Sequence, residues 1–303
     1  MPSIAHQRDA LIRQMISPTP SSPVPRLWCP PITHYTGGGR IDIDRMRAHW
    51  RTMVDHVGGF LVPGSTGEAW NMTAAEVNEL VGVALDLASA LDTRILIGVL
   101  RSTVAEMHAG IAEAVAGAQA TTGITDRLAA LRERHIAGFT VCAPTGADLD
   151  QVAIKAGLES ILDLGLPTAV YQLPQVTQNE ISPAVFDELA TRYANLMLFK
   201  DTSGKDRVPL VDRGASGVFL VRGAEGGYAT WLEESGGPYR GFLLSTANGF
   251  ARELRQVIAH LEAGETAEAI TLSGRLDEAV SAAFTAVARV PHGNAFANAN
   301  KAI

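Results

Sequence analysis

Short apolar runs alternate with helical patterns along most of this chain. The runs are rich in β-branched residues and do not alternate strictly with polar positions, as expected for parallel strands that are covered on both faces. The segments between them repeat apolar residues with a period of 3.6, for example at Val77, Leu80, Val81, Ala84 and Leu87. The pattern therefore predicts repeated strand-helix units.

Eight of these runs qualify as strands. They are Leu27 to Thr33, Gly59 to Pro63, Arg94 to Val99, Gly138 to Ala143, Thr168 to Leu173, Leu196 to Lys200, Gly217 to Arg222 and Gly241 to Ser245. Eight strand-helix units in about 250 residues are typical of a (β/α)8 TIM barrel in the α/β class. A doubly wound sheet is the alternative, but no GxGxxG or GxxxxGK[ST] motif follows any of the runs.

The barrel does not use the whole chain. We expect an N-terminal extension over residues 1–25, with a helix from Ser3 to Ile16 and a Pro/Ser-rich connector from Ser17 to Pro25. The catalytic barrel is expected over residues 26–250, and a C-terminal helical region over residues 251–303.

One connection is longer than a barrel needs, the stretch Ala118 to Ile136 before the fourth strand. We expect it to cap the barrel or to contribute to an assembly interface, together with the N-terminal helix. The apolar positions on which this expectation rests are Leu11, Ile12, Met15, Ile124, Leu128 and Leu131.

The composition excludes several kinds of binding partner. The formal net charge is −7 and no basic run is present, so nucleic acid is not an expected partner. No apolar window is long enough to span a bilayer and the N-terminus lacks a signal core, so we expect no membrane association and a cytoplasmic location. Cys29 and Cys142 lie singly in apolar runs and are expected in the core; the eight histidines show no metal-binding spacing.

Chemistry in such a barrel gathers where the strands end. Directly after the second strand comes Gly64-Ser65-Thr66-Gly67-Glu68, in which two glycines flank two hydroxyls. Backbone N–H groups in a loop of this kind can receive a carboxylate without any arginine. An ordinary tight turn explains the same letters, so the motif alone leaves both interpretations open.

Lys200 closes the sixth strand, and lysine is rare in this protein. Only four of its 25 Lys and Arg residues are lysines. A lysine at the end of an apolar strand is therefore a candidate nucleophilic amine, because a dry pocket lowers its pKa; a side chain that extends to solvent is the alternative. Tyr171, near the end of the fifth strand, is a candidate proton-transfer group or an ordinary rim residue.

Taken together, these motifs resemble the dihydrodipicolinate synthase and N-acetylneuraminate lyase superfamily. The resemblance covers about residues 30–263. It rests on four motifs in the family's order, which are Gly64 to Glu68, Tyr171-Gln172-Leu173-Pro174, Lys200-Asp201-Thr202-Ser203-Gly204 and Ser245-Thr246-Ala247-Asn248. Members are class I lyases that form a Schiff base with pyruvate or another 2-oxo acid, and they are usually homotetramers.

The resemblance implies a role for each matching residue. Lys200 would form the imine, Tyr171 would transfer protons at the reacting oxygen, and Ser65 would pass protons and, with Thr66, hold the substrate carboxylate. The other positions that the resemblance places in the substrate site are Gly64, Gly67, Thr202, Gly223 and Glu225. A carboxylate that caps the next helix is an equal explanation of Glu225. No cofactor and no metal are implied beyond the imine itself.

Two departures from the family pattern bear on the substrate. Val176 stands where dihydrodipicolinate synthases carry an arginine for the second substrate's carboxylate, so we expect a neutral or apolar group there and a protein that is not dihydrodipicolinate synthase proper. The end of the fourth strand reads Ala143-Pro144-Thr145-Gly146, where the family often has an aromatic pair that completes a proton relay across subunits. A relay within one subunit is expected instead.

Two functions remain open at this point. The first is a lyase that cleaves, condenses or dehydrates a 2-oxo acid through Lys200. The second is a protein that binds a 2-oxo acid on the same barrel without turning it over, as a sensor or structural subunit. The combined presence of an amine and a phenol favours the lyase.

Overall fold

Eight parallel strands close into a barrel in this computed structural model, which describes residues 2–17 and 23–303. Hydrogen-bonded neighbours run in the order β1-β8-β7-β6-β5-β4-β3-β2, and Cys29 pairs with Phe60 to bring β1 beside β2. The strands are β1 (Leu27–Trp28), β2 (Gly59–Val62), β3 (Arg94–Gly98), β4 (Ile136–Cys142), β5 (Thr168–Gln172), β6 (Leu196–Asp201), β7 (Phe219–Arg222) and β8 (Gly241–Leu243). The predicted (β/α)8 barrel is confirmed.

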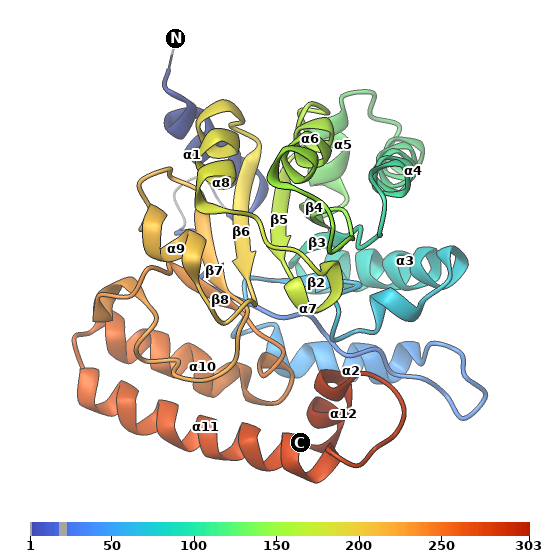
Figure 1. The fold of residues 1–303 in the computed structure, drawn as a ribbon. Coiled ribbons are helices and arrows are strands. Elements are labelled where there is room, and N and C mark those ends of the chain that lie inside the picture. Colours follow the sequence, from blue (N-terminus) through green and yellow to red (C-terminus); the bar gives the residue numbers. More distant parts are fainter. Residues whose placement is uncertain (1, 18–22) are drawn as a thin grey trace.

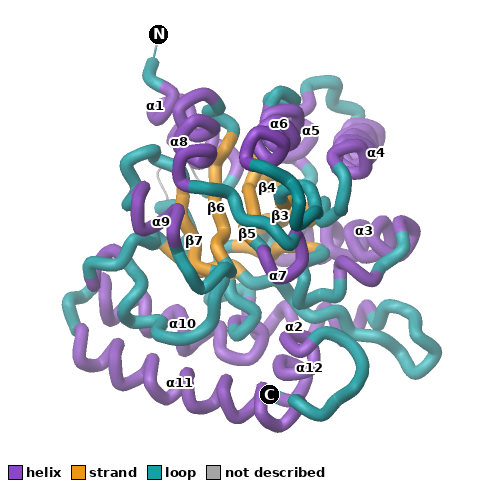
Figure 2. The backbone as a smooth tube through the Cα atoms, viewed as in Figure 1, coloured by secondary structure: helices purple, strands orange, loops and turns teal. Residues whose placement is uncertain are grey.

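Helices surround the strands on the outside (Figure 2). Those between strands are α2 (Ile43–Met53), η1 (Ala69–Asn71), α3 (Ala74–Leu91), α4 (Val104–Thr122), α5 (Arg127–Glu133), α6 (Gln151–Leu162), α7 (Pro174–Thr177), α8 (Pro183–Arg192), α9 (Arg207–Asp212) and η2 (Glu233–Ser235). Capping boxes begin α3 and α4, where Thr73 pairs with Glu76 and Thr103 with Glu106. Apolar side chains fill the space between the helices and the strands. For example, the Trp50 ring of α2 stacks on the Phe60 ring of β2, with 4.1 Å between the ring centroids.

Two strands end more than one residue before their predicted carboxyl ends. β1 stops at Trp28 instead of Thr33, because Pro30 and Pro31 have no N–H group with which to extend the ladder. β8 stops at Leu243, and the next residues turn into a helix. The residues after β1 and after β8 are therefore not part of the sheet, and they form loops at the carboxyl-terminal end of the barrel.

The N-terminal helix α1 (Ile4–Met15) lies against the end of the barrel where the strands begin, at the top of Figure 1. Its buried Arg8 donates hydrogen bonds to the carbonyls of Leu196 at 2.7 Å and Tyr193 at 2.9 Å. Ile12 and Met15 are buried within the chain itself, so the expectation that they form an assembly interface is wrong. Residues 18–22 of the predicted connector from Ser17 to Pro25 lie outside the described residues.

The long connection before β4 consists of the last turns of α4 and the helix α5. Leu131 is fully buried, and Ile124 and Leu128 pack against the same core. Helix α5 contacts β4, the strand that it precedes. The segment is thus part of the subunit's own core, and Leu131 is not available to a partner, contrary to expectation.

Three helices follow β8, namely α10 (Ala247–Glu262), α11 (Thr266–Val287) and α12 (Ala295–Ala302). Helix α10 packs on β1 and α2, and it runs across residue 250, where we predicted the boundary between barrel and C-terminal region. The division into residues 1–25, 26–250 and 251–303 stays a prediction. Figure 1 shows α11 and α12 on the side of the barrel where the strands end, opposite α1. Among the described residues, no helix is long and apolar enough to cross a membrane.

Candidate active site

Lys200 and Tyr171 are direct neighbours on adjacent strands. The register between β5 and β6 pairs Tyr171 with Lys200, so both side chains leave the sheet on the same face. The Lys200 Nζ lies 4.1 Å from the centroid of the Tyr171 ring. Both residues are almost completely buried, with Lys200 only 4% exposed. The alternative in which Lys200 extends to solvent is therefore wrong.

Burial changes the acidity of the Lys200 amine. Removing the ammonium from water lowers the pKa of Lys200 from its ordinary 10.5 to about 8. The thiols Cys142 and Cys29 and the carboxylate of Glu225 oppose this shift by favouring the charged form. A pKa near 8 leaves an appreciable fraction of free amine at neutral pH, which is the form that attacks a carbonyl.

Gly223, at the end of β7, makes room for the amine. A Cβ atom at this position would lie 2.5 Å from the Lys200 Cε and would also collide with the Thr202 side chain. The glycine that the family pattern places in the substrate site thus has a steric reason to be there. It allows Lys200 and Thr202 to lie side by side.

The Tyr171 phenol has two hydroxyl neighbours. Burial raises the pKa of Tyr171, whereas side-chain hydrogen bonding with Thr202 and Ser65 opposes this rise. Thr202 in turn donates to the carbonyl of Gln172 at 2.7 Å. The structure therefore brings together Lys200, Tyr171, Thr202 and Ser65, which come from three different strand ends.

The loop from Gly64 to Glu68 is held tightly against the segment that follows β1. A Cβ at Gly67 would meet the carbonyl oxygen of Pro31 at 2.7 Å, and Thr33 donates to the Gly67 carbonyl at 2.8 Å. A Cβ at Gly64 would meet Pro30 equally closely. The two glycines thus permit close packing, and they leave Ser65 and Thr66 between them, with Thr66 only 5% exposed.

The C-terminal helix fastens the same loop from outside. Asn294, the N-cap of α12, donates from its Nδ2 to the Ser65 carbonyl at 2.8 Å. Lys301, near the end of α12, pairs with Glu68 at 3.3 Å. The loop is therefore held by chain segments that are more than 200 residues apart in sequence.

Glu225, in the loop that follows β7, is a heavily hydrogen-bonded carboxylate. It accepts from Ser245 Oγ at 2.6 Å, Thr246 N at 3.0 Å, Thr246 Oγ1 at 2.5 Å and the Tyr228 hydroxyl at 3.0 Å. The bond from Thr246 N places it at the start of α10, as the helix-capping interpretation expects, but it also acts electrostatically on Lys200. The bond from Thr246 N agrees with a capping role, whereas the place of Glu225 in the substrate site stays a prediction.

Arg222 fixes the loop that carries Glu225. Its Nη1 donates to the carbonyls of Ala224 at 2.7 Å and Gly226 at 2.8 Å, on either side of the carboxylate. The guanidinium forms an ion pair with Asp206 at 3.5 Å and lies 4.2 Å from the centroid of the Trp231 ring. A buried arginine on the β7 strand thus sets the position of Glu225.

A small apolar cluster lies beside the phenol, apart from the main core. Its buried members are Ala69, Leu100, Cys142, Tyr171 and Leu173, and Trp70 and Val176 pack against it. Val176 thus packs on the cluster to which Tyr171 belongs, and its place in the substrate site stays a prediction. The expectation that both cysteines are buried core residues is confirmed. Cys29 lies in the main core, and Cys142 lies in this second core cluster, where its register partner is Tyr171.

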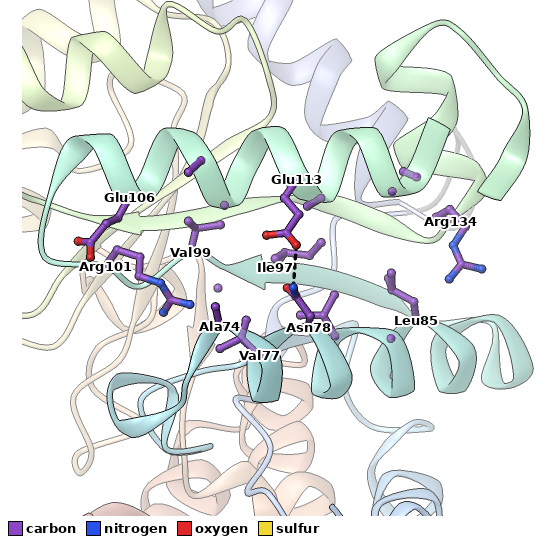
Figure 3. A pocket seen from close by; sticks show the side chains of 18 of the residues that line it. Ala74, Val77, Asn78, Leu85, Ile97, Val99, Arg101, Glu106, Glu113 and Arg134 are labelled. Atoms are coloured by element: carbon purple, nitrogen blue, oxygen red, sulfur yellow. Dashed lines mark hydrogen bonds between the residues drawn. The ribbon is translucent and has the colours of Figure 1, made fainter. Parts of the chain in front are cut away.

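A cavity of about 510 Å³ lies elsewhere, between α3 and α4 on the outer face of β3 (Figure 3). It is lined mainly by small and apolar side chains, and the Asn78 amide bonds across it to Glu113 at 2.7 Å. Arg101, which follows β3, points into this outer cavity. Among the described residues no group of three His, Cys, Asp or Glu side chains is arranged to hold a metal.

Two residues of this region were not predicted from the sequence, and the first is Trp70. Its indole Nε1 donates to Ser65 Oγ at 2.9 Å, from the short helix η1. An aromatic residue directly after a turn with two hydroxyls is a weak signal, because a turn's tertiary partners cannot be read from sequence spacing. Tyr228, three residues after Glu225, was missed for the same reason.

Comparison with known proteins agrees with this geometry. The model of the dihydrodipicolinate synthetase family matches residues 24–293. The chain belongs to the dihydrodipicolinate synthetase family. Among its curated family relatives, 4-hydroxy-tetrahydrodipicolinate synthase 1 of Streptomyces coelicolor is 28% identical over 263 residues, which cover 84% of this chain and 77% of the relative. The 4-hydroxy-tetrahydrodipicolinate synthase of Agrobacterium fabrum is 25% identical over 248 residues, covering 81% and 78%.

Solved structures share the fold of this family member at low identity. A Sulfolobus 2-keto-3-deoxygluconate aldolase matches with a TM-score of 0.67 and 16% identity, over 86% of this chain and 80% of the other. YagE, a prophage protein of E. coli K12 solved in complex with pyruvate, matches with a TM-score of 0.67 and 18% identity, over 83% and 80%. At such identities the likeness extends to the fold alone.

Proposed function

We propose that this member of the dihydrodipicolinate synthetase family is a class I lyase that forms an imine between Lys200 and the keto carbon of a 2-oxo acid. The observation that carries the proposal is a buried lysine whose pKa is lowered to about 8 and whose amine lies 4.1 Å from the centroid of a phenol ring. The family's named relatives act as synthases, and a structural neighbour is named as an aldolase, which supports the same chemistry.

The proposed reaction uses groups of this chain only. The Lys200 nitrogen adds to C2 of the 2-oxo acid, and the resulting hydroxyl leaves as water with a proton from Tyr171, which forms the iminium. In the cleavage reaction the Tyr171 phenolate takes the proton of the C4 hydroxyl, the C3–C4 bond breaks, and the C4 fragment leaves as an aldehyde while the electron pair moves to the iminium and forms an enamine. Tyr171 then gives this proton to C3, and water adds to C2, so that pyruvate leaves, the amine is restored and the phenol regains its proton. Ser65, Thr66 and the flanking Gly64 and Gly67 would receive the substrate carboxylate. We propose no cofactor beyond this covalent link.

The second part of the substrate is proposed to be neutral or apolar. Val176, Leu173 and Leu100 form an apolar wall beside Tyr171. A carboxylate placed against this wall would lose its hydration without gaining a cation, which is costly. Arg101 gives no substitute, because it points into the outer cavity between α3 and α4 (Figure 3). We therefore infer that the second substrate differs from that of dihydrodipicolinate synthase proper. We further propose that the lyase is catabolic and cytoplasmic.

The imine can be trapped chemically. Incubation with pyruvate and borohydride, followed by intact mass and peptide mapping, is expected to give one stable adduct on Lys200. Lys205→Met is the matched control, since Lys205 lies at the surface in an ion pair with Glu180 and its removal should leave the adduct unchanged. Lys200→Met should give none. No adduct with any 2-oxo acid in the wild type would favour the binding protein without turnover.

Aldol cleavage and dehydration share this imine and are separated by their products. A panel of 2-oxo-3-deoxy sugar acids and of aryl- or alkyl-substituted 2-oxo acids should be assayed for pyruvate released and for water lost. We expect substrates with neutral or apolar tails to turn over faster than those with a second carboxylate. The reverse order would contradict the assignment of Val176 to the specificity wall.

A further inference from the structure

Asn294 joins two distant parts of the chain through the two ends of its side-chain amide. Its Oδ1 accepts from the backbone N–H of Phe296 at 2.8 Å and so caps helix α12. Because the oxygen is used for the cap, the amide nitrogen must face the other way. There it donates to the carbonyl of Ser65 at 2.8 Å. The capping bond thus fixes the direction of the bond to Ser65.

The Ser65 carbonyl is held by two donors. Besides the bond from Asn294, it accepts from the N–H of Glu68 at 3.0 Å, which closes the turn of the loop. A carbonyl oxygen has two lone pairs, and both are used here. The peptide group that carries this oxygen therefore cannot rotate without losing at least one of the two bonds.

The same peptide group carries the N–H of Thr66. In a planar trans peptide the C=O and N–H bonds point in opposite directions, so the Thr66 N–H points away from α12. Within the described part of the chain this N–H donates to no backbone or side-chain acceptor, although Thr66 is only 5% exposed. A nearly buried donor is costly to leave unpaired, and it suits a ligand that brings an acceptor such as a carboxylate.

We propose that Asn294 is a positioning residue for substrate binding, which aims the Thr66 N–H at the carboxylate of the 2-oxo acid. The inference rests on the proposed function, in which the loop from Gly64 to Gly67 receives this carboxylate. Asn294 holds the C=O end of the peptide group against α12 and leaves the N–H end to the substrate. Helix α12 thus raises the substrate affinity of a loop that lies 229 positions earlier in the chain.

The test measures imine formation with pyruvate, so the natural substrate need not be known. Cyanoborohydride traps the imine on Lys200, and intact mass gives the trapping rate at each pyruvate concentration. Asn294→Ser keeps a good N-cap for α12, but its shorter side chain lacks the amide N–H that reaches Ser65. We expect the half-saturating pyruvate concentration to rise about threefold to tenfold, the contribution of one hydrogen bond. The maximal trapping rate should stay unchanged, because the bond to the carboxylate is the same before and during the reaction.

Two controls separate this role from a loosened helix. Lys301→Met removes the other attachment of α12, the surface ion pair with Glu68, and leaves Asn294 in place, so we expect an unchanged half-saturating concentration. Methyl pyruvate keeps the reactive ketone without the negative charge, so its trapping at low concentration should be nearly as fast in Asn294→Ser as in the wild type.

Three results would overturn the role of Asn294. They are an unchanged half-saturating pyruvate concentration in Asn294→Ser, an equal rise in Lys301→Met, and an equal loss of trapping with methyl pyruvate. Absence of a trapped adduct in the wild type would instead overturn the proposed function, and this inference with it.

Discussion

Replacing Lys200 by methionine should stabilise the folded protein while it abolishes imine formation. The side chain is 4% exposed, and burial lowers its pKa from 10.5 to about 8. At neutral pH the ammonium is therefore less stable in the fold than in the unfolded chain, by about 3 kcal/mol for a pKa difference of this size. Methionine has a similar length and no charge, so Lys200→Met should gain up to this amount.

The gain in stability of Lys200→Met over the wild type must fall as the pH rises. At pH 7 most of the lysine is charged in both states, and nearly the full penalty on the wild type is present. Between pH 8 and pH 10.5 the unfolded chain holds more protons than the folded one, so the stability of the wild type rises with pH. The advantage of Lys200→Met should therefore fall to about half by pH 9.5 and vanish above pH 10.5.

Denaturant unfolding at pH 7 and pH 9.5, followed by circular dichroism at one protein concentration, measures both effects. Lys205→Met is the matched control, because the Lys205 side chain is 54% exposed and should give little change at either pH. A Lys200→Met protein no more stable than the wild type at pH 7 would refute the reasoning. So would a gain of the same size at both pH values, which would trace to methionine packing.

Three further outcomes are expected. Tyr171→Phe should still form the borohydride-trapped adduct, more slowly, and lose about 10² to 10⁴ in turnover, the usual share of a proton-transfer group; an unchanged rate would reduce Tyr171 to a rim residue. Gly223→Ala should impair trapping at Lys200, because the new methyl group would lie 2.5 Å from the Lys200 Cε, and unimpaired trapping would show that the lysine has another route into the site. Light scattering should give a homo-oligomer, as in the family, with four times the 32.1 kDa chain mass expected; a monomer at working concentration would contradict this.

The sequence predicted the barrel well because strands and helices differ in their apolar period. Each of the eight predicted runs overlaps one strand, and the order of the elements follows from their alternation. Errors fall where local chemistry overrides the period. Pro30 and Pro31 end the β1 pairing early, and Pro174 begins the unpredicted short helix α7 at its first position.

The candidate site was predictable only to the extent that strand ends converge. Lys200 and Tyr171 could be placed together because both close strands of one barrel. The indole of Trp70 and the thiol of Cys142 could not, since their roles depend on side-chain direction in the folded state. Likewise, the apolar face of the N-terminal helix was visible in the sequence, but whether it faces its own barrel or a partner is decided by Arg8 and its carbonyl partners.

The attachment of α12 to the Ser65 loop has a consequence for biosynthesis. Asn294 and Ser65 are 229 positions apart, and the β1 and β8 strands that close the barrel are separated by almost the same length of chain. Because a nascent chain emerges from its N-terminus, the first half of the barrel waits for partners that the ribosome makes much later. The loop around Ser65 is thus complete only after α12 has been made, long after the strand that precedes this loop has emerged.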